Sequence, residues 1–330
     1  MHMQAVWYER QGAANQVLKF GDRELPVVGD GDVLVRLHSS AVNPSDIKKR
    51  SGGQAVEFPA GFIIPHSDGA GVIEAVGGGV SENRLGQRVW IYRAQFERHM
   101  GTAAEYVAVP SITAPALPDN TGFDIGACLG IPLMTAHRAV FIQGDVCRLN
   151  ILVTGASGRV GYYAAQLAKA AGARVIATAG SDARCQVARQ TGADEVLNYR
   201  SDDLVSAIAE FTDGQGVDRI VEVEFGVNAA TSAAVLKNGG IISTYSSSLA
   251  PQPTIPFYPM MFKNISVNLI LVYNMPETAK QQAILDINRA LAKNQLRHRI
   301  AQSWSLEQTV KAHESIEQGG KDGCVVIDIP

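Results

Sequence analysis

The sequence predicts an α/β protein that combines an antiparallel β domain with a doubly wound parallel sheet. The chain has 330 residues, a length that suits two domains better than one. The first third carries short strand patterns separated by Gly, Pro and Asp, whereas strand and helix patterns alternate from about residue 126. Hydrophobic residues make up 46% of the chain, so both domains can bury a core.

The predicted elements follow this division. In the first domain, strands are expected over residues 5–8, 32–41, 71–76, 88–91 and 104–109. In the second, an interrupted helix is expected over 125–141, strands over 150–154, 174–179, 195–198, 218–223 and 240–244, and helices over 161–171, 182–191 and 203–211. The tail carries helices over 278–294 and 306–318 and a strand over 324–329, and we expect it to pack on the first domain.

Charge and cysteine content exclude several classes of protein. The net charge of −3 argues against a nucleic acid or an anionic membrane as the main partner. No apolar run has the length of a transmembrane helix, and the N-terminus lacks a signal-peptide pattern. Cys128, Cys147, Cys185 and Cys324 form no C-x-x-C pair, which indicates free thiols in a reducing, cytoplasmic location.

A glycine-rich turn links the strand at 150–154 to the helix that follows. Its sequence is Thr154-Gly155-Ala156-Ser157-Gly158-Arg159-Val160-Gly161. A dinucleotide needs a tight turn, a bare backbone near its pyrophosphate and a helix N-terminus aimed at it. The flanking strand and helix, together with the next strand, supply the context that this fingerprint requires. A structural turn that serves another ligand is the alternative. The side chain of Arg159 is expected to point to solvent while its amide faces phosphate.

The end of the second strand distinguishes NADH from NADPH. An NAD site carries an acidic residue about twenty positions after the turn, where it binds the ribose hydroxyls. Residues 177–181 contain none, and Asp182 stands at a helix start, where it can act as a cap. Arg184 can pair with a 2′-phosphate, and Tyr199 can add a hydroxyl or an aromatic face. The sequence therefore favours NADPH.

Three other kinds of site lack their motifs. Ser157 lacks the final glycine of a hydrolase nucleophile elbow. No tyrosine is followed by lysine four residues later, as a short-chain dehydrogenase would require. The histidines at positions 66, 99, 137, 298 and 313 show no zinc-ligand spacing.

A polar loop is expected over residues 41–50, after a strand. Its Asn43 can hydrogen-bond a ribose or a carbonyl, and its Lys48 can stabilise an enolate or phenolate oxygen as charge develops. A solvated basic turn, with Asn and Pro as turn formers, is the alternative. The residues alone leave both interpretations open.

The order and spacing of these motifs resemble the zinc-independent quinone oxidoreductases, the zeta-crystallin branch of the medium-chain dehydrogenase/reductase superfamily. The resemblance spans essentially the whole chain. Its segments are Ala41-Val42-Asn43-Pro44, Arg50-Ser51-Gly52, residues 67–77 (Ser-Asp-Gly-Ala-Gly-Val-Ile-Glu-Ala-Val-Gly), residues 130–139 (Gly-Ile-Pro-Leu-Met-Thr-Ala-His-Arg-Ala), the glycine-rich turn, Thr178-Ala179-Gly180, Asn198-Tyr199-Arg200 and Ala312-His313-Glu314.

The resemblance implies a GroES-like catalytic domain over residues 1–127 and 272–330 and a Rossmann NADPH-binding domain over residues 128–271. It also implies a cofactor between the domains and a homodimer joined edge to edge through the Rossmann sheets, near residues 266–273. Zinc-dependent relatives carry Cys at the position of Asn43 and His at the position of Ser67, and they have a four-cysteine lobe where residues 92–101 stand. No metal is therefore expected.

The resemblance also implies a set of cofactor-binding residues. Ser157, Gly158, Arg159 and Val160 match the pyrophosphate turn, and Ser181, Arg184 and Tyr199 match the 2′-phosphate set. Residues expected toward the ribose and nicotinamide are Pro132, Thr135, Phe225, Ser246, Leu271 and Val272. Asn43 matches a residue at the reacting end.

Two positions depart from the family pattern. Arg159 replaces a glycine, and Lys48 replaces a tyrosine, so that Asn-Pro-x-Asp-x-Lys is similar to the enone (2-alkenal) oxidoreductases of the same superfamily. The predicted function is hydride transfer from NADPH to a quinone, with Asn43 and Lys48 as catalytic residues and enone C=C reduction as the alternative. A non-catalytic NADPH-binding, structural crystallin-type or RNA-binding protein is the alternative from another class. The acidic net charge weighs against RNA binding.

Overall fold

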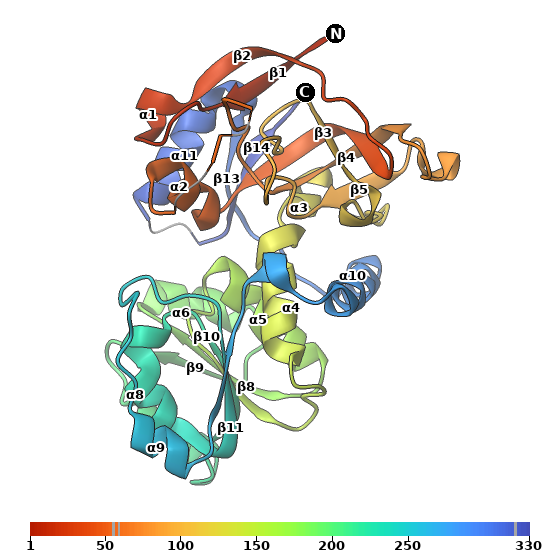
Figure 1. Cartoon of the computed structure of the whole chain (residues 1–330). Coiled ribbons are helices and arrows are strands. Elements are labelled where there is room, and N and C mark those ends of the chain that lie inside the picture. The colour runs from red at the N-terminus through yellow and green to blue at the C-terminus, as the bar shows by residue number, and fades with distance from the viewer. Residues whose placement is uncertain (55–56, 59, 320–321) are drawn as a thin grey trace. The chain divides into compact units, whose positions relative to one another are not determined.

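The computed structural model describes residues 1–54, 57–58, 60–319 and 322–330 and divides the chain into two compact units (Figure 1). Unit 1 contains Met1–Ile131, Ile284–Asn294 and His298–Pro330, and unit 2 contains Pro132–Ala283 and Gln295–Arg297. The expected domain boundary at 271/272 differs from this division. Residues 272–283 belong to unit 2, where the short helix η4 (Val272–Asn274) packs on α4 (Met134–Phe141).

Unit 1 is built on a sheet with the strand order β13-β14-β3-β4-β5, and β6 pairs with β3. All pairs are antiparallel except β13 with β14, and a separate antiparallel ribbon joins β1 and β2. The strands are β1 (His2–Trp7), β2 (Lys19–Glu24), β3 (Asp32–Val42), β4 (Asp68–Val76), β5 (Arg88–Ile91), β6 (Tyr106–Pro110), β13 (Ile300–Ser305) and β14 (Cys324–Asp328).

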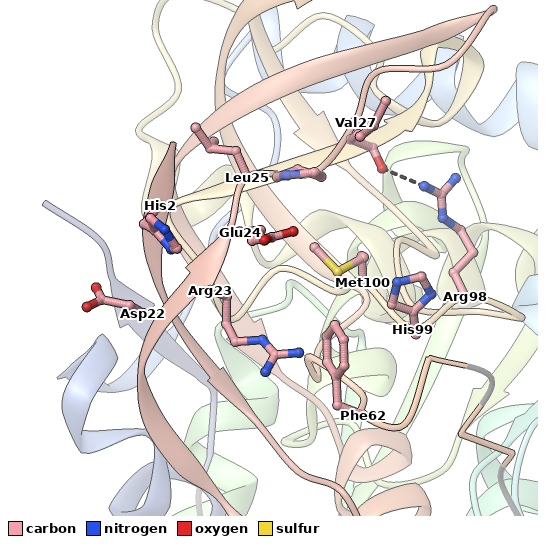
Figure 2. Close-up of a pocket in the computed structure, with 12 residues that line it drawn as sticks. His2, Asp22, Arg23, Glu24, Leu25, Val27, Phe62, Arg98, His99 and Met100 are labelled. Carbon is pink, nitrogen blue, oxygen red and sulfur yellow. Dashed lines mark hydrogen bonds between the residues drawn. The ribbon is translucent and has the colours of Figure 1, made fainter.

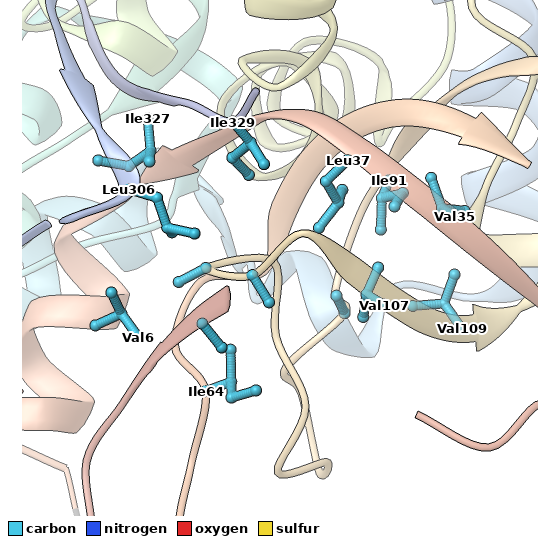
Figure 3. Packing of buried hydrophobic residues seen from close by; sticks show 14 of the residues in the cluster. Val6, Val35, Leu37, Ile64, Ile91, Val107, Val109, Leu306, Ile327 and Ile329 are labelled. Carbon is cyan, nitrogen blue, oxygen red and sulfur yellow. The ribbon is translucent and has the colours of Figure 1, made fainter. Parts of the chain in front are cut away.

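Alternation along the strands builds the core of unit 1. Val33, Val35 and Leu37 of β3 are completely buried, while the residues between them are half-buried. Figure 3 shows Val35 and Leu37 with Ile91, Val107 and other aliphatic side chains of this cluster. Each fully buried side chain of this size contributes about 1.5–3 kcal/mol through removal of apolar surface from water.

The helices of unit 1 are short and lie between its strands. They are α1 (Ala14–Val17), α2 (Pro44–Ser51), η1 (Glu82–Arg84), η2 (Ser111–Thr113), α3 (Phe123–Gly126), η5 (Leu306–Gln308) and α11 (Thr309–Glu317), and α10 (Glu277–Ala292) contains the boundary between the units.

The prediction of a loop over residues 41–50 is wrong, because most of this segment forms the helix α2. Asn43 is the N-cap, Pro44 begins the helix, and the Asp46 carboxylate accepts a hydrogen bond from the Asn43 amide over 2.7 Å. Gly52 ends the helix with a φ of 95°. The residues taken for turn formers are therefore a helix-start signal.

Unit 2 contains a parallel sheet with the strand order β12-β11-β10-β7-β8-β9. The chain changes direction across the sheet between β7 and β10, as in a dinucleotide-binding doubly wound fold. Its strands are β7 (Asn150–Val153), β8 (Arg174–Ala179), β9 (Glu195–Asn198), β10 (Val217–Glu222), β11 (Leu236–Thr244) and β12 (Ser266–Leu269). Its helices are η3 (Leu129–Leu133), shared with unit 1, and α4, α5 (Arg159–Ala170), α6 (Asp182–Arg189), α7 (Leu204–Phe211), α8 (Phe225–Val235), α9 (Phe257–Phe262) and η4.

Local signals set the ends of several helices in unit 2. The hydroxyl of Ser181 and the carboxylate of Asp203 accept bonds from the first-turn amides of α6 and α7. Gly172 and Gly192, with φ values of 83° and 82°, follow the ends of α5 and α6. These positions agree closely with the predicted elements.

The region expected to join two copies, residues 266–273, is a strand only in its first half. β12 ends at Leu269, and Val272 begins the 3₁₀ turn η4. Leu271 is extended, but it lies outside the sheet. Within the described residues, no helix has the length and apolar character needed to cross a membrane.

Candidate functional site

The glycine-rich turn of unit 2 has the backbone geometry of a tight strand-to-helix connection. Gly155 has a φ of 63°, and the amide of Ala156 donates to the Thr178 carbonyl of β8 over 2.9 Å. A Cβ on Gly161 would lie 2.5 Å from the Gly155 carbonyl oxygen, so only glycine lets α5 pass this close to the turn. The turn therefore needs its glycines for packing as well as for approach by a ligand.

The first residues of α5 fit the pyrophosphate of a dinucleotide. Gly158 is the N-cap, Arg159 and Val160 are the first helical residues, and Ser157 is buried beside them. A Cβ on Gly158 would lie 3.2 Å from the Gly155 carbonyl oxygen, a tight contact, so glycine suits this position as well. First-turn amides of a helix have no intrahelical acceptor, and they favour an anion. The turn lies where the strand order reverses, between β7 and β10.

A buried carboxylate braces this turn from β10. Glu222 Oε1 accepts bonds from the Thr154 hydroxyl at 3.0 Å and the Asn228 amide at 2.9 Å, and burial raises the pKa of the Glu222 carboxyl. The same Thr154 hydroxyl accepts from the Val223 amide. Sequence reasoning missed Glu222. Its signal was an acidic residue directly after the apolar pair Ile220-Val221, at the end of a strand.

The predicted 2′-phosphate residues surround the end of β8. A Cβ on Gly180 would lie 2.4 Å from the Tyr199 hydroxyl, so Tyr199 rests directly on this glycine. The Ser181 hydroxyl accepts from the Arg184 amide over 3.4 Å. Asp182 does not act as the cap, since its carboxylate accepts from the Asn198 side chain at 2.9 Å. Arg200 lies 6.0 Å from the Tyr199 ring and adds a second cation.

The residues expected toward the nicotinamide fall in three places of unit 2. Phe225 begins α8, and its amide donates to the Ser246 carbonyl over 3.0 Å, so these two residues are brought together. Pro132 lies in the π-helical segment η3, and Thr135 follows in the first turn of α4. Val272 begins η4, which packs on α4, whereas Leu271 is exposed.

At the start of α2 in unit 1, Asn43 is held by a buried carboxylate. Its side-chain amide donates to Asp68 Oδ2 over 2.8 Å, and the Ile131 amide donates to the same oxygen over 2.8 Å. Asp68 is completely buried, and burial raises the pKa of its carboxyl well above the usual value. Asp68 therefore fixes the orientation of the Asn43 carboxamide.

The two lysines of α2 differ in their surroundings. Lys48 is exposed, whereas Lys49 is 5% exposed and donates to Gln95 Oε1 over 2.9 Å. Burial lowers the pKa of the Lys49 ammonium. The sequence analysis singled out Lys48 and did not show that its neighbour Lys49 is the buried lysine. Only their positions on the helix distinguish the two residues.

Two histidines form a buried pair beneath this region. Nε2 of His66 lies 2.9 Å from Nε2 of His313 on α11, and Nδ1 of His66 lies 2.9 Å from the Ser40 hydroxyl. His66 has a φ of 77°, which is unusual for a residue other than glycine. Within the described ranges, no three His, Cys, Asp or Glu side chains gather in a metal-binding arrangement.

Comparison with known proteins agrees with this architecture. The GroES-like domain model of alcohol dehydrogenases matches residues 29–119, and the zinc-binding dehydrogenase model matches residues 160–288. Among solved structures, an NAD-dependent alcohol dehydrogenase is 28% identical with a TM-score of 0.90, covering 99% of this chain and 100% of its own. The quinone oxidoreductase from Coxiella burnetii is 25% identical with a TM-score of 0.85, covering all of both chains.

Curated relatives extend the match to a narrower group. A quinone oxidoreductase of Pongo abelii is 33% identical over 317 residues, which cover 94% of this chain and 94% of the relative. The quinone oxidoreductase of Homo sapiens is 32% identical over the same length and coverage. This identity extends over nearly the full length of both proteins. It therefore includes both the GroES-like unit and the unit with the dinucleotide-type sheet. The chain therefore belongs to the quinone oxidoreductase family of the medium-chain dehydrogenase/reductase superfamily.

Proposed function

We propose that this chain is an NADPH-dependent reductase that transfers hydride to quinones. The observation that carries the proposal is a complete dinucleotide turn in a member of the quinone oxidoreductase family. Bound NADPH supplies the hydride, and the protein supplies binding, orientation and electrostatic stabilisation. In this proposal Ser157, Gly158, Arg159 and Val160 hold the pyrophosphate through the first turn of α5.

The choice of NADPH rests on the end of β8. No acidic side chain ends this strand, and the nearby Asp182 carboxylate is engaged by Asn198. Ser181, Arg184 and Tyr199 would receive the 2′-phosphate, with Tyr199 placed by its contact with Gly180. An arginine binds phosphate through a charge-assisted, geometrically specific contact. Pro132, Thr135, Phe225, Ser246, Leu271 and Val272 would lie toward the ribose and nicotinamide.

Asn43 and Lys48 are the proposed catalytic residues on the acceptor side. Hydride addition to a quinone or an enone places negative charge on a carbonyl oxygen, and preorganised donors stabilise that charge. Asn43 is preorganised by Asp68, and the Lys48 ammonium can donate a proton to the oxygen or pass this task to water. Lys48 in place of a tyrosine keeps enone reduction as the second candidate activity.

The assembly we propose is a homodimer joined through β12. This strand is the edge of the unit 2 sheet, and its neighbourhood exposes apolar side chains. Leu269 is 79% exposed, Leu271 52% and Phe262 79%. An uncovered sheet edge with apolar side chains favours pairing with another strand. The same edge of a second copy offers a matching surface.

The experiment that tests the function is an acceptor panel. NADPH and NADH oxidation would be followed separately with a small para-quinone, a 2-alkenal and no acceptor. The proposal expects acceptor-dependent oxidation that is faster with NADPH and faster with the quinone. Faster turnover of the alkenal would instead support the enone reductase. Tight NADPH binding without turnover of either acceptor would contradict an enzymatic function and favour the non-catalytic alternative.

A further inference from the structure

Unit 1 contains a cavity whose lining includes none of the residues proposed for the cofactor or the acceptor. Its volume is about 630 Å³, within the range of small-molecule sites. The inner wall includes Arg23, Phe62, Arg98, His99 and Met100, which come from β2 and from two loops. Figure 2 shows the Arg23, Phe62, His99 and Met100 side chains gathered around the same space, with Arg98 at the far side.

The strand register places Arg23 on the inner face of the β1–β2 ribbon. Arg23 pairs with Met3, which is 1% exposed, whereas the next residue, Glu24, pairs with the exposed His2. Neighbouring residues of a strand point to opposite faces. Arg23 therefore belongs to the inner wall, and the Glu24 and His2 side chains belong to the rim.

Aromatic contacts hold the Arg23 guanidinium in place. Its central carbon lies 3.7 Å from the Phe62 ring centroid and 4.9 Å from that of Trp7. A guanidinium stacked on a ring keeps its N–H groups in its own plane, where they can meet a carboxylate with two parallel bonds. The His99 ring stands edge-on to Phe62, with 5.4 Å between centroids.

The inner wall presents two cationic side chains, Arg23 and Arg98, and the carboxylates Asp22 and Glu24 line the same cavity. In the part of the chain that the structure describes, neither Arg23 nor Arg98 forms an ion pair with a carboxylate. Arg98 donates to the Ala108 carbonyl over 2.6 Å, which fixes one of its nitrogens. On the rim, the Asp22 carboxylate is engaged by the Gln4 side chain.

We propose that this cavity binds a small aromatic carboxylate. The carboxylate would pair with Arg23, Arg98 would add positive charge from the far side of the cavity, and the ring would lie against Phe62 and Met100. Burial and the two arginines lower the pKa of the His99 imidazole, so His99 is a neutral hydrogen-bonding group at pH 7. The rim carboxylates Asp22 and Glu24 disfavour dianions such as nucleotides and phosphate monoesters, which leaves a monoanion as the fitting charge.

The test uses 2-naphthoate as the probe and the full chain loaded with NADPH, so that the dinucleotide site is filled. Isothermal titration calorimetry should show saturable binding of 2-naphthoate at one site per chain. The neutral analogue 2-naphthalenemethanol should bind at least tenfold more weakly, because it cannot pair with the guanidinium groups.

Two variants locate the binding. Arg23→Gln should weaken 2-naphthoate binding at least tenfold and Arg98→Gln by a smaller factor, and both should leave NADPH oxidation unchanged. The control is Arg36→Gln, an exposed arginine of the same unit that pairs with Glu74 outside the cavity, and it should bind as the unaltered chain does. The proposal is overturned if the unaltered chain shows no saturable binding. It is also overturned if all three variants bind equally, which would place the probe elsewhere.

Discussion

Nε2 of His66 and Nε2 of His313 lie 2.9 Å apart in a pair of completely buried imidazoles. One ring must donate an N–H and the other must accept it, so at least one histidine is neutral. Burial lowers the pKa of His66 to about 3, and burial, His66 and Arg50 together lower the pKa of His313 well below its usual value. Both rings are therefore neutral in the folded chain at pH 7.

The first prediction is a loss of stability in mild acid. The pKa values of both histidines are lower in the folded chain than the unfolded value of about 6.5. The neutral imidazoles therefore stabilise the fold fully above pH 6.5, and this stabilisation is lost as the pH falls toward the His66 pKa of about 3. Protonation of His66 should cost about 2 kcal/mol between pH 7 and pH 5, and His313 changes the stability in the same direction. Urea unfolding at several pH values measures this loss. His66→Asn should flatten the dependence, whereas the exposed His2→Gln should not; a flat curve for the unaltered chain would refute the prediction.

The second prediction concerns the 2′-phosphate. Arg184→Ala should weaken NADPH binding by roughly ten- to a hundredfold and leave NADH binding nearly unchanged, because it removes a charge-assisted contact that only NADPH makes. Fluorescence titration of both cofactors measures the change. Arg189→Ala, at the other end of α6, is the matched control. Equal loss of both cofactors in Arg184→Ala would contradict the assignment.

The third prediction concerns the contact beneath Tyr199. In Gly180→Ala the new methyl group would meet the Tyr199 hydroxyl at 2.4 Å, and the half-exposed ring must move away. The KM for NADPH should rise roughly tenfold, with a smaller change for NADH, because a 2′-phosphate partner is displaced. Gly29→Ala, whose Cβ would meet nothing closer than 3.5 Å, serves as the control. Unchanged NADPH kinetics would exclude Tyr199 from the phosphate site.

The fourth prediction tests Lys48 as a catalytic residue. Lys48→Ala should lower kcat for quinone reduction roughly tenfold without changing NADPH affinity, because it removes a cation from the developing oxyanion. Lys311→Ala, an exposed lysine of α11 in the same unit, is the control. Steady-state kinetics with varied quinone and fixed NADPH supply the comparison. If both variants retain full activity, the proton and charge stabilisation come from elsewhere.

The fifth prediction concerns assembly. Leu269→Lys should convert the proposed dimer into a monomer, because it places a charge on the apolar edge at β12. Light scattering coupled to size-exclusion chromatography would report the mass. Leu249→Lys is a matched control, since both leucines are 79% exposed but residue 249 lies outside the strands. A monomeric unaltered chain, or two variants with the same mass as the parent, would contradict the interface.

Local signals made much of unit 2 predictable. β8 and β9 have the expected bounds, and Ser181 and Gly192 mark the ends of α6. The sequence analysis missed β13, half of whose residues are polar, because its strand character depends on pairing with β14, about 24 residues away along the chain. It also missed α8, an alanine-rich helix that begins next to a glycine. Long-range pairing explains the first omission, and the weak helix formers Gly226, Asn228 and Thr231 explain the second.

The candidate site was predictable only where it is continuous in the sequence. The turn at residues 154–161 could be recognised as one motif, but its brace Glu222 lies more than sixty residues away. The helical periodicity of α2 places Lys48 on the exposed side and Lys49 on the buried side. A segment predicted to be a loop has no such periodicity, so the two lysines could not be told apart. Arg23 and Arg98 become neighbours of one cavity only through the fold of unit 1. Proximity between distant residues is set by tertiary structure, and composition does not encode it.

The uncovered edge at β12 has a practical consequence for handling the protein. If two copies cover this edge, subunits that separate on dilution expose Leu269 and the strand edge beside it. The exposed edges can then aggregate in non-native arrangements. Activity would then decay with time in nanomolar stocks and persist in concentrated ones. An unrelated carrier protein would not prevent this decay, whereas an inactive variant of the same chain, added in excess, would.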